Sequence, residues 1–206
     1  MDEQVVLILH GWGGNKPEHW QEHLYSRLTG ENIPVYYPLM PTPTSPEPNA
    51  WTDAVRRELG AINRHHPDCL LTVVAHSLGS ITWMHLVAGL AAAPERIADR
   101  VLLVAPPYIM QCAPPPDAPH SVSHFFPPPI YPAAIHAAAR ETVLVCSNND
   151  DYATYDQTQG YGAALQIPVH LLEGAGHISP YYGYGRWTWV EDWCMGAAEL
   201  PPLPKR

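Results

Sequence analysis

A serine in the first half of the chain has the sequence context of an enzymatic nucleophile. Ser77 lies in the segment Ala75-His76-Ser77-Leu78-Gly79, between an apolar, β-branched run (70–74) and a run with helical spacing of apolar residues (81–88). A nucleophile on such a strand-to-helix turn has a strained backbone that exposes its hydroxyl, and the residues two before and two after it must be small. Gly79 meets this requirement, and Ala75 departs from it by one methyl group. The motif predicts nucleophilic attack by the Ser77 hydroxyl.

A serine needs a base within hydrogen-bond reach at neutral pH, and that base needs a carboxylate to orient it. His177 is the candidate base, because it follows the last predicted strand in a glycine-rich loop. The candidate acid follows the strand before, where we favour Asp150, with Asp151 as the second choice and Asp156 as a distant third. The order of serine, acid and histidine along the chain is typical of a catalytic triad, and it predicts one made of Ser77, Asp150 and His177.

The same reading predicts an oxyanion hole and part of a substrate pocket. Two backbone N–H groups are needed to bind the oxyanion of the tetrahedral intermediate. We expect them from Leu78, directly after the nucleophile, and from Trp12, in the glycine-rich loop after the first predicted strand. The Trp12 indole is also a candidate pocket wall, as are the aromatic side chains of Tyr108, Phe125 and Phe126.

The other histidines do not indicate a metal site. His19 and His23 have the i, i+4 spacing that metal ligands can use, but no H-E-x-x-H pattern accompanies them. We therefore expect these two at a surface or interface and predict neither a metal nor a cofactor. His76, beside the nucleophile, is expected to pack or to position the turn.

Strand and helix patterns alternate along the chain. This alternation predicts an α/β fold with a mostly parallel central sheet flanked by helices on both faces. The expected strands cover residues 5–10, 35–38, 70–74, 100–105, 142–146 and 169–172. Besides the helix after Ser77, helices are expected over 17–28, 49–63, 155–165 and 187–198, with Asn49 as an N-cap.

Length and composition limit the possible classes of protein. The chain has 206 residues, which predicts one domain over 1–206. Its formal net charge of -9 argues against a nucleic-acid partner, because phosphate binding needs clustered Lys and Arg. We see no signal peptide and no apolar stretch of the roughly 20 residues that cross a bilayer. Four scattered cysteines are expected to be reduced thiols, so we expect a cytoplasmic protein that does not bind membranes.

Residues 106–132 form an expected insertion that is rich in proline and aromatic residues. Three clusters of consecutive prolines exclude a long regular helix or a central strand there. We expect this segment to pack over the carboxyl edge of the sheet as a pocket wall, although a plain connector would have the same composition.

With these residues placed, the chain resembles the RBBP9/YdeN family of small serine hydrolases, a branch of the α/β-hydrolase fold. The resemblance covers nearly the whole chain and implies a Ser77, Asp150 and His177 triad with esterase-like activity. It favours Asp150 over Asp151. The similar segments are His10-Gly11, Glu18-His19-Trp20, Leu39-Met40-Pro41 with Pro46 and Trp51, Ala75–Gly79, Ser147–Asp150, Gly174–His177 and Gly183–Trp187.

We therefore expect a serine hydrolase that cleaves small carboxylic esters, with short acyl groups, through an acyl-enzyme. An amidase or peptidase is a variant of this hypothesis, because the same triad serves both kinds of bond. A weakly catalytic or non-catalytic binding module on the same fold is the alternative, motivated by Ala75 and by the 7 Trp and 11 Tyr residues. A lyase, haloperoxidase or C–C hydrolase would also suit the scaffold. The sequence does not indicate an oligomeric state.

Overall fold

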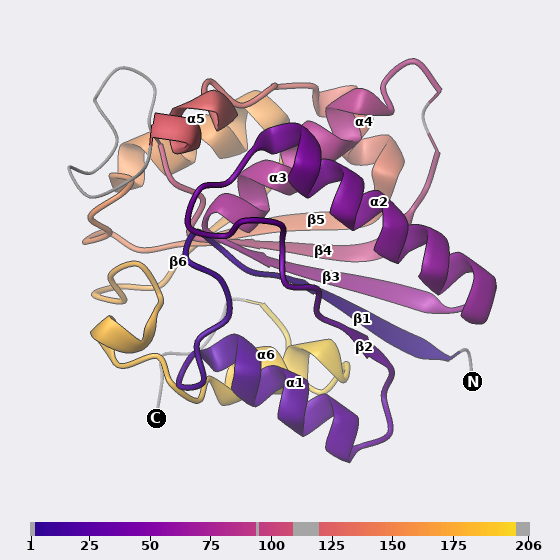
Figure 1. Cartoon of the computed structure of the whole chain (residues 1–206). Coiled ribbons are helices and arrows are strands. Elements are labelled where there is room, and N and C mark those ends of the chain that lie inside the picture. Colours follow the sequence, from indigo (N-terminus) through magenta and orange to yellow (C-terminus); the bar gives the residue numbers. More distant parts are fainter. Residues whose placement is uncertain (1–2, 94, 109–119, 201–206) are drawn as a thin grey trace.

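The computed structural model describes residues 3–93, 95–108 and 120–200 and shows one twisted sheet covered by helices (Figure 1). The sheet has six strands in the order β2-β1-β3-β4-β5-β6, and every neighbouring pair is parallel. The carboxyl ends of parallel strands meet at the same edge of the sheet. The strands are β1 (Gln4–Leu9), β2 (Val35–Tyr36), β3 (Leu70–His76), β4 (Ala98–Val104), β5 (Ala139–Cys146) and β6 (Val169–Leu171).

The strand order reverses direction between β1 and β3. From β1 the chain moves to β2 on one side and then returns to β3 on the other. In open α/β sheets, ligands bind in the crevice at the carboxyl ends of the strands where this reversal occurs. The loops after β1 and β3 carry the two predicted oxyanion donors and the predicted nucleophile, so the topology places these residues at that crevice.

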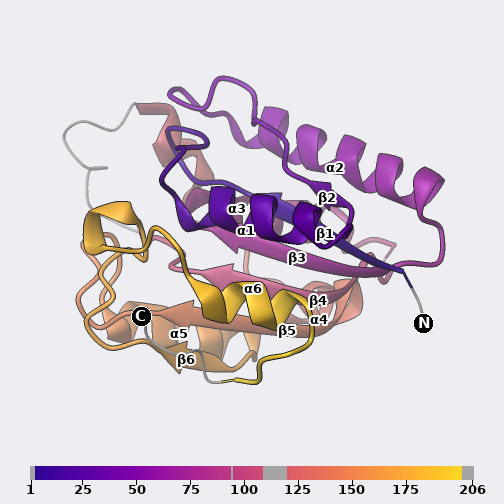
Figure 2. The same ribbon diagram turned by 90° about the horizontal axis from the view of Figure 1, so that it is seen from below.

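Helices cover both faces of the sheet, as Figures 1 and 2 show together. Among the described residues, one face carries four α-helices and the other carries two, and each set packs against its own buried cluster of apolar side chains. The first set is α2 (Pro48–His65), α3 (Leu78–Gly89), α4 (Pro132–Ala138) and α5 (Tyr155–Leu165), and the second is α1 (Trp20–Gly30) and α6 (Thr188–Cys194). The expected α/β architecture is confirmed.

The central strand β1 shows why the two faces are both apolar. Val5, Leu7 and Leu9 belong to the cluster under α2 and α3, whereas Val6 and Ile8 belong to the cluster under α1 and α6. Successive side chains of a strand point to opposite faces, so a strand covered on both sides must be apolar throughout. All five side chains are at most 1% exposed.

Several helix ends differ from expectation. Helix α1 begins at Trp20, with His19 as its N-cap, and not at residue 17. Helix α2 begins at Pro48 with Glu47 as its N-cap, so Asn49 lies inside the helix and does not cap it. The fixed φ of proline suits the first helical position, and this preference outweighs the capping preference of asparagine. The last helix ends at Cys194 and not near residue 198. Gly196 has a φ of 74°, a left-handed conformation that does not continue a helix.

The expected insertion is only partly described. Residues 109–119 lie outside the described part of the chain. This segment contains Cys112 and one of the three proline clusters. After it comes a short 3-10 helix (His120–Phe125), and the chain then enters α4 at Pro132, a helix that the sequence analysis missed within the proline-rich background. Within the described ranges, no helix is both long and apolar enough to span a bilayer.

Candidate active site

Ser77 lies on a strained turn between β3 and α3. Its φ of 53° and ψ of -125° are unusual for a residue with a side chain, and a strained backbone was expected here. The Ser77 N–H donates to the carbonyl oxygen of Val104 at 2.8 Å, which ties the turn to the neighbouring strand β4. The conformation is thus held by the sheet, and the hydroxyl faces a hollow at its carboxyl edge.

Close backbone approaches around Ser77 explain its small neighbours. A Cβ added to Gly79 would lie 2.6 Å from the carbonyl oxygen of Leu9, and one added to Gly11 would lie 2.9 Å from the Cβ of Ser77. Ala75, in contrast, is a fully buried residue of β3 whose methyl group has room in the core. The departure from glycine at this position therefore leaves the turn intact.

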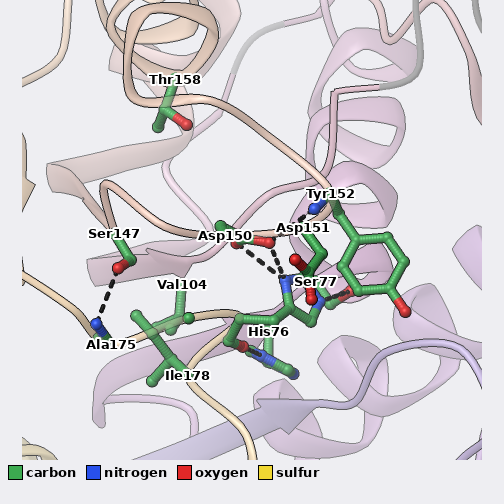
Figure 3. A network of polar contacts seen from close by, with 12 residues as sticks. His76, Ser77, Val104, Ser147, Asp150, Asp151, Tyr152, Thr158, Ala175 and Ile178 are labelled. Carbon is green, nitrogen blue, oxygen red and sulfur yellow. Dashed lines mark hydrogen bonds and ion pairs between the residues drawn. The ribbon is translucent and has the colours of Figure 1, made fainter. Parts of the chain in front are cut away.

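His177 joins Ser77 to Asp150, two residues that are labelled in Figure 3. The Ser77 hydroxyl lies 2.8 Å from Nε2 of His177, and Nδ1 of His177 lies 3.0 and 2.9 Å from the two carboxylate oxygens of Asp150. The Asp150 side chain is only 2% exposed. A carboxylate on Nδ1 fixes the tautomer in which Nε2 can accept the serine proton. The structure brings all three predicted residues together in the order that nucleophilic catalysis requires.

The two other candidate acids point elsewhere. Asp151 accepts a hydrogen bond from the Tyr182 hydroxyl, and Asp156 lies exposed in the first turn of α5. Asp150 also accepts the backbone N–H of Tyr152 at 2.8 Å, which holds the carboxylate in place. The geometry therefore favours Asp150 as the orienting acid.

The predicted oxyanion donors border the same hollow. Leu78 is the first residue of α3, so its N–H has no partner within the helix, and the positive end of the helix dipole favours negative charge there. Trp12 lies in the loop after β1, which is fixed by a bond from the Gly13 N–H to the Pro43 carbonyl at 2.9 Å and by one from the Trp12 indole to the Thr44 carbonyl at 3.3 Å. Both residues line the hollow beside Ser77.

The hollow has a volume of about 760 Å³ and is only partly the pocket that we expected. Trp12 lines it, but Tyr108, Phe125 and Phe126 do not. Phe125 is fully buried and packs edge-on against Trp51, with ring centroids 5.6 Å apart, while Tyr108 packs against Tyr161. Of the four expected pocket walls, only Trp12 therefore lines this hollow, because Phe125 belongs to the apolar cluster under α2 to α5 and Tyr108 and Phe126 pack against it.

Other aromatic residues that the sequence analysis missed form the rim. Tyr152, Tyr181 and Tyr182 line the hollow, and the Tyr152 ring lies 4.4 Å from that of His177. Their place near the site could have been predicted from the sequence, because each tyrosine follows a predicted triad residue by no more than five positions. Residues that follow the carboxyl end of a strand lie near the site.

Two neutral histidines pack next to His177. His19, expected at a surface or interface, is instead buried as the N-cap of α1, where its Nδ1 accepts the Gln21 N–H at 3.2 Å. Its ring lies 4.9 Å from that of His76, whose Nε2–H donates to the carbonyl oxygen of His177 at 2.9 Å. Burial, with a smaller contribution from His177, lowers the pKa of His19 to about 3, and burial lowers the pKa of His76 well below its usual range. Neither ring adds a positive charge beside His177 at neutral pH.

Several solved structures have a similar fold. The ydeN gene product from B. subtilis has a TM-score of 0.75 and 18% identity, covering 94% of this chain and 98% of that chain. Est1E from Butyrivibrio proteoclasticus has a TM-score of 0.67 and 11% identity, covering 95% and 86%. A deformylase from Pseudomonas putida has a TM-score of 0.62 and 12% identity, covering 88% of each chain. Identities this low establish a shared fold and nothing about the reaction.

Sequence comparison assigns the family, which the fold alone does not. No curated protein sequence gives a significant match. The likeness to the ydeN gene product agrees with the resemblance expected from the motifs, and the single-domain α/β-hydrolase fold is confirmed. The model of one family matches residues 6–194, a range that contains Ser77, Asp150 and His177, and the chain therefore belongs to the serine hydrolase family.

Proposed function

We propose that this hydrolase cleaves small carboxylic esters through an acyl-enzyme formed on Ser77. The observation that carries the proposal is the continuous chain of hydrogen bonds from the Ser77 hydroxyl through His177 to the buried Asp150, at the edge of an open hollow. A serine, a base and an orienting acid in this arrangement are the machinery of acyl transfer.

The reaction follows from the positions of the three side chains. As Oγ of Ser77 attacks the ester carbonyl carbon, its proton moves to Nε2 of His177, and Asp150 stabilises the resulting imidazolium. The N–H groups of Trp12 and Leu78 bind the oxygen that becomes negative. His177 then donates the proton to the departing alcohol, which leaves the acyl group on Ser77. Water, deprotonated by His177, releases the carboxylic acid and restores the serine.

The hollow allows a wider range of acyl groups than we expected. The preference for short acyl groups relied on Trp12, Phe125 and Phe126 filling the pocket, and only Trp12 lines it. A volume of about 760 Å³ falls within the range of small-molecule sites. Amide cleavage is the second candidate, because His177 can protonate an amine as well as an alcohol. Comparing an ester with its matched amide separates the two.

We also propose a cytoplasmic location. The three described cysteines, Cys69, Cys146 and Cys194, are free thiols, which supports a reducing compartment. Burial raises the pKa of Cys146 and of Cys194 to about 12, so neither is a reactive thiolate at neutral pH.

The test compares Ser77→Ala with the wild type. We expect the wild type to hydrolyse p-nitrophenyl esters and to be labelled by a fluorophosphonate, and we expect the variant to lose both activities. Loss of a triad nucleophile lowers kcat by about 10⁶-fold in a comparable system. Ser26→Ala is the matched control, because Ser26 is an exposed serine on α1. Wild-type hydrolysis by Ser77→Ala, or a wild type that neither hydrolyses nor labels, would overturn the proposal and favour the binding module.

A further inference from the structure

The loop that carries His177 has little regular backbone of its own. It follows β6, and Gly174, Gly176 and Ile178 have φ values of 67°, 55° and 47°. Left-handed residues at alternate positions prevent the loop from continuing either a strand or a helix. Backbone N–H groups in such a segment need partners from outside it, and the position of the imidazole depends on what those partners are.

Consecutive side chains after β5 supply these partners. Asn148 Oδ1 accepts the Gly174 N–H at 2.9 Å, and Ser147 Oγ accepts the Ala175 N–H at 2.9 Å. Asn149 Oδ1 accepts the Gly176 N–H at 2.7 Å. Asp150, the next residue, holds the imidazole of His177 itself. The four consecutive residues 147–150 thus bind the four consecutive residues 174–177. Figure 3 shows the bond between Ser147 and Ala175 beside Asp150.

Ser147 and Asn149 are also bonded to each other. The Ser147 hydroxyl donates to Asn149 Oδ1 at 2.7 Å, so this one oxygen accepts both the hydroxyl and the Gly176 N–H. Ser147 is fully buried, whereas Asn149 is exposed. The pair forms a small network in which the serine orients the amide and the amide holds the residue directly before His177.

The backbone on the other side of His177 is fixed as well. The His76 ring donates to the His177 carbonyl, and the Trp20 indole donates to the Ile178 carbonyl at 2.8 Å. Donors from β3 and α1 therefore hold the carbonyl groups, while the side chains after β5 hold the N–H groups. The backbone that carries the imidazole can shift only if one of these contacts breaks.

We propose that Asn149 and Ser147 are positioning residues, which set the His177 imidazole between Ser77 and Asp150 through the amides of Gly176 and Ala175. The inference rests on the proposed hydrolase function. Of the three residues whose side chains accept the loop N–H groups, we expect Asn149 to have the largest effect on the position of His177, because it bonds the adjacent residue Gly176. Its side chain is exposed, so replacing it leaves the core unchanged. A displacement of about 1 Å at a reacting group can cost about 100-fold in rate.

The experiment compares Asn149→Leu, which keeps the size but removes the acceptor, with Asn149→Asp, which keeps an acceptor oxygen. With p-nitrophenyl acetate we expect Asn149→Leu to lower kcat by about 10- to 100-fold with KM changed by less than about 3-fold, and Asn149→Asp to recover most of the loss. Thr158→Val is the control, because the Thr158 hydroxyl donates to the carbonyl oxygen of Thr154, the N-cap of α5, and lies apart from the loop (Figure 3). We expect it to keep the wild-type kcat.

Fluorophosphonate labelling distinguishes positioning from loss of folded protein. If Asn149 positions His177, Asn149→Leu lowers the rate constant of labelling but not the final labelled fraction. A lower final fraction with an unchanged rate constant would show a merely structural role and overturn the inference. Equal kcat in Asn149→Leu and wild type would also overturn it, while leaving the proposed function standing. A wild type that is not labelled would overturn the proposed function and, with it, this inference.

Discussion

Gly11 and Gly79 mark the two closest backbone approaches around the Ser77 turn. The missing side chain of Gly79 lets the first turn of α3 approach the carbonyl groups of Leu9 and His10, and that of Gly11 leaves room for Ser77 itself. The sequence predicted the need at Gly79 from the motif, but not at Gly11, because the motif covers only the residues next to Ser77 in the chain. At the residue scale, Ser77 can thus keep its position because Gly11 and Gly79 have no side chain to collide with it or with the loop after β1.

A methyl group at Gly11 should reduce activity more than it reduces stability. In Gly11→Ala the added Cβ would meet the Cβ of Ser77 at 2.9 Å and its hydroxyl at 3.3 Å, so the nucleophile must move. We expect kcat on p-nitrophenyl acetate to fall about 10- to 100-fold and the free energy of unfolding to fall by about 1–3 kcal/mol. Kinetics and urea unfolding on the same preparation measure both.

Gly160→Ala is the matched control for this prediction. Gly160 lies within α5, where an added Cβ would meet nothing within 4 Å. Alanine is favoured over glycine in a helix by about 1 kcal/mol, so this variant should be slightly more stable and equally active. Wild-type kcat in Gly11→Ala would show that the Ser77 turn tolerates the methyl group and would contradict the prediction.

At the element scale, the N-terminus of α1 is built around a buried histidine. His19 caps the helix through Nδ1 and packs against His76 and Trp20. The sequence predicted a helix here but placed His19 at a surface or interface, because the i, i+4 spacing with His23 describes one face of a helix and not what covers it. Only the packing of α1 against the loop of His177 shows that the ring is desolvated.

Acid should destabilise the protein through His19. Its pKa of about 3 in the folded state lies below its unfolded value of 6.5, so the unfolded state binds the proton first as the pH falls. Stability is therefore full above pH 6.5 and decreases from there toward pH 3. Between about pH 6.5 and pH 4.5 the contribution amounts to about 2–3 kcal/mol. Urea unfolding at both pH values measures it.

His19→Asn isolates this contribution, because asparagine also caps helices but does not titrate. We expect this variant to lose about 2–3 kcal/mol less on acidification than the wild type does. His23→Asn, on the exposed side one turn later, is the control. An acid dependence in His19→Asn equal to that of the wild type would show that another group is responsible.

At the scale of the whole molecule, two separate apolar clusters hold the sheet. The smaller set of helices, α1 and α6, relies on large aromatic side chains, since Trp20, Trp187, Trp189 and Trp193 all belong to its cluster and are at most 3% exposed. The guanidinium of Arg100 also lies over the Trp193 ring, 3.7 Å from the ring centroid, in a cation–π contact. Short helices can cover a face of the sheet here because indole rings bury large areas.

Removing one of these rings should cost much of the stability. Trp193→Ala should lower the free energy of unfolding by about 3–5 kcal/mol, the range for a buried large-to-small change. Tyr181→Ala is the control, because that side chain is 89% exposed and its loss should change stability by less than about 0.5 kcal/mol. Urea unfolding compares the two. A cost below about 1 kcal/mol for Trp193→Ala would mean that α6 contributes little to the fold.

The sequence by itself determined the six strands and five of the six α-helices of the described residues, the nucleophile turn and the identity of the three residues that the structure joins by hydrogen bonds. These features can be predicted from local patterns, because hydrophobic periodicity and turn chemistry depend on residues close in the chain. The carboxyl ends of parallel strands then bring such turns to one edge, whatever the details of packing.

Only the tertiary structure decided which side chains surround that edge. Phe125 was expected in the pocket and lies in the core, whereas Tyr181 borders the hollow. The bonds from Ser147 and Asn149 to the loop of His177 likewise join segments that no local pattern connects. The physical reason is that burial and hydrogen-bond partners depend on which distant surfaces meet, and this is settled by the packing of the whole chain.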